Sequence, residues 1–205
     1  MTKQKRFIPK GDYGYISSEK KKRLLITAGL FVLPLTVFFA AWVVNGTRNN
    51  VLTVLAIVGC LPGCRSMVNY IMLLRCKSMN RELYQEIKKH QGNLVMAWEM
   101  YMTFYEKSAA VDAFAICGNT VVGYSSDPKI DAKYMASNAQ KLVRKNGYKV
   151  DVKILTELKP FLERLDSMNE HKESLEEGIK FVPDNRYPDL SRNELIKHTL
   201  LALCL

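Results

Sequence analysis

Two long runs of apolar residues lie in the N-terminal part of the chain. Residues 24–45 carry no charge, and a helix of these 22 residues is about 33 Å long at 1.5 Å per residue. Residues 51–74 form the second run, after a polar stretch at 46–50 whose Gly and Asn residues suit a tight reversal. Because the hydrocarbon core of a bilayer is about 30 Å thick, the two runs predict a hairpin of transmembrane helices.

Shorter elements follow from residue 79. Residues 79–92 predict a helix, and the stretch 98–106 places Trp98, Met100, Met102 and Phe104 on alternate positions, the period of a strand, although a helical period also fits. The apolar stretches 109–117 and 120–126 are separated by Gly118-Asn119, a dipeptide typical of a turn between paired strands. The sequence therefore predicts a helix followed by three strands.

Helix-capping residues and the spacing of apolar residues predict the remaining elements. Asp127 and Pro128 suit the start of a helix that ends at Asn146-Gly147, and residues 148–155 alternate as a strand. Residues 160–168 predict a helix, because Phe161, Leu162, Leu165 and Met168 share one face of it.

The last helix is predicted from Ser191 and Glu194, which have the spacing of a capping box. An irregular, partly helical connector at 170–190 precedes it. The predicted fold class is a membrane protein with a two-helix transmembrane hairpin and an α+β domain at residues 79–205, in the order α-β-β-β-α-β-α-α.

Charge orients the predicted hairpin. Residues 1–23 form an arm with eight Lys or Arg residues against two acidic ones. Basic residues are also frequent directly after the second run, whereas Arg48 is the one basic residue between the runs. Because cytoplasmic loops are enriched in Lys and Arg, both termini and the domain are predicted to be cytoplasmic, in an integral protein of the cell membrane.

The arm also explains the net charge of +10. A nucleic-acid-binding protein carries its basic excess on the folded domain, where it neutralises phosphates. Residues 75–205 have nearly balanced charge, so we expect no nucleic-acid partner.

Arg65 is a charged residue within the second apolar run. It lies 14 residues from Val51, about 21 Å along a helix, which leaves roughly 9 Å to the inner surface. A long side chain can reach the headgroups from there, so Arg65 can anchor the helix. Alternatively it turns inward, where Pro62 has freed the carbonyl of Val58, and satisfies that oxygen or a partner chain.

Gly59 and Gly63 form a GxxxG pair in the same run, and small residues let helix backbones approach closely. The pair can pack against the first run or against a second copy of the chain. Gly59, Pro62, Gly63 and Arg65 are therefore the candidate residues for membrane packing or for binding a partner.

No motif in the chain predicts a catalytic, cofactor or metal site. The sequence has no GxSxG, P-loop, HExxH or GxGxxG pattern, and its cysteines and histidines lack metal-ligand spacing. We therefore expect no cofactor and no metal ion.

The predicted order α-β-β-β-α-β resembles the core of the restriction-endonuclease-like fold over residues 79–155. Asp112 lies in the second predicted strand, where that family has a metal-binding aspartate. The family's third strand supplies an acid and a lysine two residues later, but this chain has Gly123, Tyr124 and Ser125 there. The triplet Asp151-Val152-Lys153 has the required residues on a different strand. The resemblance therefore implies a degenerate or cryptic nuclease at most.

The whole chain is also similar to a family of bacterial membrane proteins with two transmembrane helices and a cytoplasmic α+β domain. The similarity lies in the stretches "GYISSEKKKR", "NGTRNNVLTVLAIVGCLPGCRSMVNYIM" and "FLERLDSMN". It implies a topology and a domain extent but no activity.

From these observations we expect a membrane-anchored, non-enzymatic cytoplasmic module that binds or regulates through protein-protein contacts. Its expected partners are the lipid bilayer and a protein, or a second copy that associates through the hairpin. Two alternatives remain, a metal-dependent nuclease that uses Asp112 and a module that binds a lipid surface through the basic arm.

Overall fold

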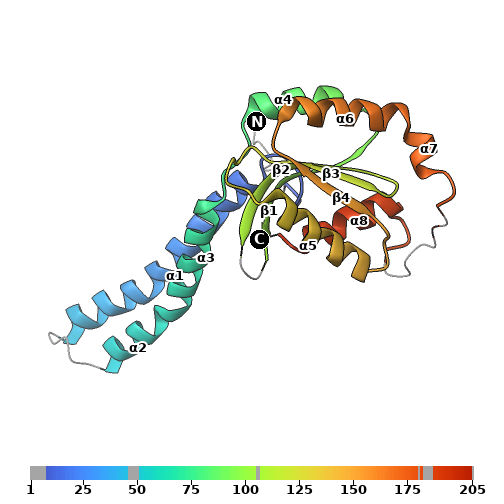
Figure 1. The fold of residues 1–205 in the computed structure, drawn as a ribbon. Helices are drawn as coiled ribbons and strands as arrows, with labels where there is room; N and C mark the ends of the chain where they lie inside the picture. Colours follow the sequence, from blue (N-terminus) through green and yellow to red (C-terminus); the bar gives the residue numbers. More distant parts are fainter. Residues whose placement is uncertain (1–7, 46–50, 105–106, 180, 182–186, 205) are drawn as a thin grey trace, which may run out of the picture. The chain divides into compact units, whose positions relative to one another are not determined.

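The computed structural model describes residues 8–45, 51–104, 107–179, 181 and 187–204. The chain divides into two compact units, shown as ribbons in Figure 1. The first unit combines Met1–Tyr15 with Ser78–Leu205, and the second is Ile16–Lys77. The predicted loop at 46–50 lies outside the described residues.

The second unit is helical and consists of α1 (Tyr15–Asn45), α2 (Val51–Gly59) and α3 (Leu61–Arg75). The stretches Tyr15–Val43 and Thr53–Arg75 are long and apolar enough to cross a membrane, and most of their residues are exposed. Both predicted apolar helices are therefore present, and α1 begins well before the uncharged run.

A break at Cys60 divides the second apolar run, for which the sequence predicted one helix. Pro62 explains the break, because proline has no N–H to donate to the carbonyl of Val58. Helical bonding resumes at once, since the N–H of Cys64 donates to the carbonyl of Cys60 at 3.0 Å.

The first unit is built around a mixed sheet of four strands in the order β1-β2-β3-β4. The strands β1 (Val95–Thr103), β2 (Ser108–Cys117) and β3 (Thr120–Tyr124) are antiparallel to their neighbours. After α5 (Ala132–Lys145), the chain returns as β4 (Asp151–Leu155), which is parallel to β3. A crossover helix is what a parallel neighbour requires, and it confirms the predicted order of these elements.

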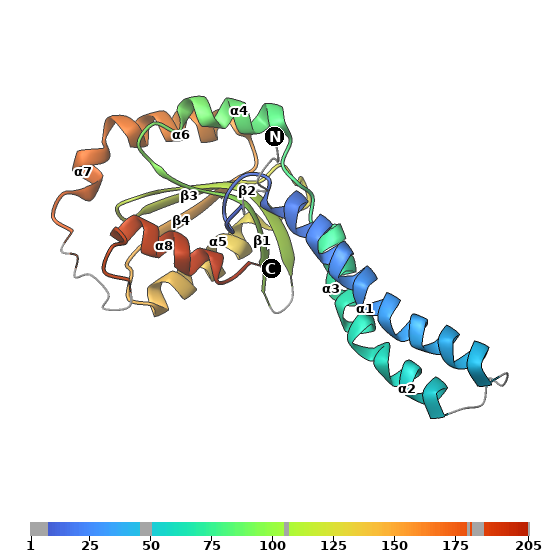
Figure 2. The same ribbon diagram turned by 180° about the vertical axis from the view of Figure 1, so that it is seen from behind.

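Helices cover both faces of this sheet, as Figures 1 and 2 show. Side chains of α4 (Arg81–His90) and α6 (Leu158–Glu170) pack on one face, around Phe161 and Leu165. Side chains of α5 and α8 (Arg192–Leu201) pack on the other, around Phe114 and Met135. The short α7 (Lys172–Glu176) lies in the predicted connector.

Helix caps were predicted with mixed success. Ser191 and Glu194 form the predicted capping box of α8. The predicted N-cap Asp127 is wrong, because α5 begins later with Asp131 as its cap, accepting from the N–H of Tyr134 at 3.1 Å. Asp127 instead forms a turn in which its carbonyl accepts from Ile130.

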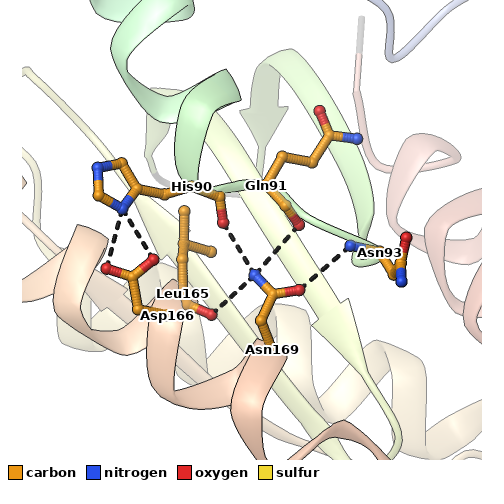
Figure 3. A network of polar contacts seen from close by, with 6 residues as sticks. All are labelled: His90, Gln91, Asn93, Leu165, Asp166 and Asn169. Carbon is orange, nitrogen blue, oxygen red and sulfur yellow. Dashed lines mark hydrogen bonds and ion pairs between the residues drawn. The ribbon is translucent and has the colours of Figure 1, made fainter.

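Asn169 joins the end of α4 to α6 (Figure 3). Its side-chain N–H groups donate to the carbonyls of His90 at 2.9 Å and Leu165 at 3.1 Å, while its oxygen accepts from the N–H of Asn93 at 3.2 Å. His90 contacts Asp166 at 2.8 Å beside it. This network fixes the chain where it turns from α4 into β1.

Candidate functional site

Glu99 and Asp112 are buried carboxylates at facing positions of β1 and β2. The paired positions around them are Trp98 with Ala113 and Met100 with Val111. Glu99 is 6% exposed and Asp112 is 9% exposed. Because burying a charge is costly without compensation, the partners of these two side chains decide what the site can do.

At Glu99 and Asp112 the alternation of side chains in β1 and β2 shifts by one residue, so residues two positions apart point to opposite faces of the sheet. Trp98 and Ala113 lie in the core under α4 and α6, whereas Met100 and Val111 lie in the core under α5 and α8. In a regular strand, residues two positions apart share a face. Glu99 has a φ of +50°, in the left-handed region that non-glycine residues rarely adopt. The predicted alternation is therefore wrong at Trp98.

The Glu99 carboxylate accepts hydrogen bonds from two distant parts of the sequence. One oxygen accepts from the N–H of Gly14 at 3.0 Å, directly before α1. The other accepts from the hydroxyl of Ser78 at 2.6 Å and the N–H of Met79 at 3.1 Å, shortly after α3. One side chain thus binds both segments that flank the helical unit in the sequence. We call Glu99, Gly14, Ser78 and Met79 the junction clasp.

Residues 8–15 contribute further contacts to the same unit. The N–H of Trp98 donates to the carbonyl of Gly11 at 2.8 Å, and the ring of Tyr13 stacks on Tyr84 with centroids 4.0 Å apart. Lys197 lies 3.6 Å from Asp12. Residues 8–15, from the middle of the predicted basic arm, are therefore part of the packed domain.

Asp112 has a different partner, because its Oδ2 accepts from the N–H of Ser126 at 2.6 Å. The pKa of its carboxyl is raised, first because burial disfavours the charged form. The bond from Ser126 lowers this pKa and partly offsets burial, while the nearby Glu99 raises it. Burial and Asp112 also raise the pKa of the Tyr124 hydroxyl.

The surroundings of Asp112 differ from the endonuclease pattern. Tyr124 on β3 pairs with Ala113, the residue after Asp112, and its ring centroid lies 5.5 Å from that of Phe161. Asp151 and Lys153 are exposed on β4. Within the described part of the chain, no group of three or more His, Cys, Asp or Glu side chains is placed to hold a metal ion.

Gly59 and Gly63 both face α1 in the helical unit. A Cβ on Gly63 would lie 3.2 Å from the ring of Phe31, and one on Gly59 would lie 3.3 Å from the Cβ of Pro34. The hydroxyls of Thr27 and Ser66 are 2.7 Å apart across the same helix pair. The glycines therefore pack within the chain.

Pro62 and Arg65 are exposed on the helical unit, and so is Asn69, one turn beyond Arg65. Arg65 and Asn69 therefore place two exposed polar side chains within the second apolar run.

A hollow of about 200 Å³ lies at the turn between β2 and β3, beside the start of α8. Its polar groups bind one another: Arg192 donates to the carbonyl of Gly118, and Asn193 donates to Glu176 at 2.7 Å. The N–H of Gly118 donates to Asn193 at 3.2 Å. These bonds tie α8 to the sheet.

No family model, curated protein or solved structure matches this chain.

Sequence reasoning placed Asp112 on the second strand but missed Glu99. The signal was a single acidic residue inside an otherwise apolar strand, "VMAWEMYMT". Nothing in the local pattern indicates that its partners lie at Gly14 and Ser78.

Proposed function

We propose that the chain is a membrane-anchored module whose cytoplasmic α+β domain binds a protein partner and has no catalytic role. The helical unit is the anchor, with both termini in the cytoplasm. The junction clasp carries the proposal, because it binds the chain on both sides of the anchor to one side chain of the sheet. A change in the domain is thereby linked to both chain segments that lead to the membrane.

Burial of the two carboxylates supports a structural role. Glu99 accepts hydrogen bonds from three donors, and the N–H of Met79 is buried among them. Leaving a buried donor without its hydrogen bond costs about 1–3 kcal/mol. Asp112 is held by a backbone N–H and lies beside a tyrosine on the third strand. A site that activates water needs open positions for a metal or substrate.

The anchor is tested with charges placed on its exposed surface. Leu33 and Leu61 lie near the centres of the two apolar runs and are 70% and 63% exposed. In a bilayer, an arginine at the centre of a span costs about 2.5–3.5 kcal/mol, whereas on a helix in water it costs little. We expect Leu33→Arg together with Leu61→Arg to release the protein from membranes on alkaline carbonate extraction. Ser18→Arg, at an exposed position in the basic part of α1, is the control and stays in the membrane fraction.

The partner is tested by crosslinking intact cells and purifying the full chain in mild detergent. The proposal predicts a defined protein that crosslinks to wild type and less to Glu99→Ala, with Glu163→Ala as the exposed control on α6. Full release of wild type by carbonate, or equal crosslinking of all three proteins, contradicts it.

A further inference from the structure

The two edges of the sheet differ in how they are covered. At β1, Trp98 donates to the carbonyl of Gly11, and Thr103 donates to the carbonyl of Leu203 at 3.3 Å. Met102 also pairs with Cys204 near the C-terminus, which lies beside β1 in Figures 1 and 2. Segments from both ends of the chain therefore cover this edge.

At the other edge, β4 has one strand neighbour, β3, among the described residues. Asp151 donates to the carbonyl of Asn119 at 2.8 Å, and Leu155 accepts from Ser125 at 3.0 Å. The backbone groups of the odd-numbered residues of β4 thus bond to β3. Because these groups alternate in direction along a strand, the backbone N–H and C=O groups of Val152 and Ile154 point away from β3. Figure 1 shows β4 between α5 and α6 at this edge.

The open edge has two chemically different faces. Val150, Val152 and Ile154 are buried against α5 in the core of that face. Asp151 and Lys153 alternate with them on the opposite face, with side chains 61% and 71% exposed. An exposed strand edge is a template for pairing, and a lysine on it opposes most incoming strands.

We propose that this edge binds β4 of a second copy of the chain, in an antiparallel pair centred on Val152. In that register Val152 faces its own counterpart, and Asp151 of each copy faces Lys153 of the other. Directly opposed residues in antiparallel strands lie on the same face, so two opposite-charge pairs form. The outward N–H and C=O groups of Val152 bond mutually, which makes Asp151 and Lys153 the closer, non-hydrogen-bonded pair.

Charge complementarity favours β4 of a second copy as the strand that binds this edge. The edge presents one acidic and one basic residue at positions that exchange under a two-fold axis, so the surface is complementary to itself. A strand without an acidic residue opposite Lys153 offers that lysine no partner beyond Asp151 of its own strand, whose carboxylate lies 4.0 Å from the Lys153 Nζ. The inference rests on the proposed function, since it names the protein that the domain contacts, and it replaces the hairpin as the site of self-association.

Charge reversals test the pairing in the full chain, with two differently tagged copies co-expressed and extracted in mild detergent. Asp151→Lys alone opposes Lys to Lys, and Lys153→Asp alone opposes Asp to Asp. We expect each variant to bind its own copies roughly tenfold more weakly than wild type, since two attractive charge pairs become repulsive. Co-expression of the two variants opposes Lys to Asp again, so capture between them returns to the wild-type level.

The exposed reversal Glu163→Lys on α6 serves as the control and leaves capture unchanged. Melting temperatures close to that of wild type show that the exposed substitutions leave the fold intact. Capture that is equal in all variants overturns the proposal and assigns self-association to the hairpin. Loss without rescue in the mixed pair also overturns it, and indicates a different partner strand. Neither outcome affects carbonate extraction, so the membrane anchor of the proposed function is tested separately.

Discussion

Glu99 has the most unusual position of any single residue in the sheet that the structure describes. Its backbone adopts the left-handed region at φ +50°, which costs of order 1–3 kcal/mol for a non-glycine residue. The cost is offset by the hydrogen bonds from Gly14, Ser78 and Met79. The strained backbone and the junction clasp therefore depend on each other.

We expect Glu99→Ala to destabilise the full chain by about 2–4 kcal/mol, because three donors lose their acceptor while the backbone strain remains. Denaturant unfolding in detergent measures the change. Glu163→Ala, at an exposed position of α6, is the control and shifts stability by less than about 0.5 kcal/mol. Equal effects of the two substitutions would show that the clasp is not a stabilising contact.

Asp112 gives a prediction about how the stability of the fold depends on pH. Its folded pKa is raised, so it favours the folded state at low pH and loses that contribution as pH rises through the folded pKa. Asp112→Asn has no such charge and its side-chain oxygen can still accept from Ser126. We expect the variant to melt higher than wild type at pH 7, and the difference to vanish below about pH 4, where the unfolded carboxyl is also protonated.

The same variant tests the nuclease alternative. With Mg²⁺ or Mn²⁺ present, we expect no rise in the melting temperature of wild type, because the structural partner of Asp112 is a backbone N–H. A rise that grows with metal concentration and is lost in Asp112→Asn would support a metal site instead.

At the scale of elements, close packing between α1 and α3 depends on Gly63. Leu at this position would meet the ring of Phe31, whereas a Cβ on Gly29 of α1 meets no atom within 4 Å. We expect Gly63→Leu to separate the helices and Gly29→Leu to leave them packed.

A disulfide between cysteines at Thr27 and Ser66, whose hydroxyls are 2.7 Å apart, reports this packing. In a Cys60→Ser, Cys64→Ser background, maleimide labelling should show the bond in the Gly29→Leu chain and its loss in the Gly63→Leu chain. Efficient disulfide formation in both would contradict the packing at Gly63.

Most elements could be predicted because their signals are local. The uncharged run at 24–45, the Gly118-Asn119 turn and the capping box of Ser191 depend on neighbours in sequence. The break at Cys60 follows from Pro62, two residues away. The clasp could not be predicted, since Gly14, Ser78 and Glu99 meet only after the sheet has formed.

Asp127 and Asp131 show a second feature that the sequence alone does not decide, namely where the helix begins. Both residues can cap a helix, and the four-residue spacing leaves either start possible. The structure uses Asp131 and forms a turn at Asp127, where Lys129 donates to its side chain at 3.0 Å. The shift in side-chain alternation at Glu99 could likewise not be predicted, because strict alternation assumes an extended backbone at every position.

At the scale of the whole molecule, the α+β domain includes chain from both sides of the helical unit. Residues 8–15 supply the carbonyl of Gly11, the ring of Tyr13 and the N–H of Gly14. The predicted domain at 79–205 lacks these contacts, although its helices and strands provide two apolar cores of their own.

We expect residues 78–205 to fold and stay soluble alone, and to melt several degrees higher when residues 8–15 are joined through a flexible linker. The control carries residues 8–15 in scrambled order on the same linker. Equal melting temperatures for the native and scrambled segments would contradict a structural role for residues 8–15.

Topology decides whether the domain and both flanking segments share one compartment, and thiol labelling in intact cells measures it directly. Single cysteines are placed at Thr2, Asn49 and the exposed Glu163, and labelling by an impermeant maleimide is compared with the parent chain before and after permeabilisation. A membrane hairpin with a cytoplasmic domain predicts labelling at Asn49 in intact cells, and at Thr2 and Glu163 only after permeabilisation. Labelling of Thr2 or Glu163 in intact cells would contradict it.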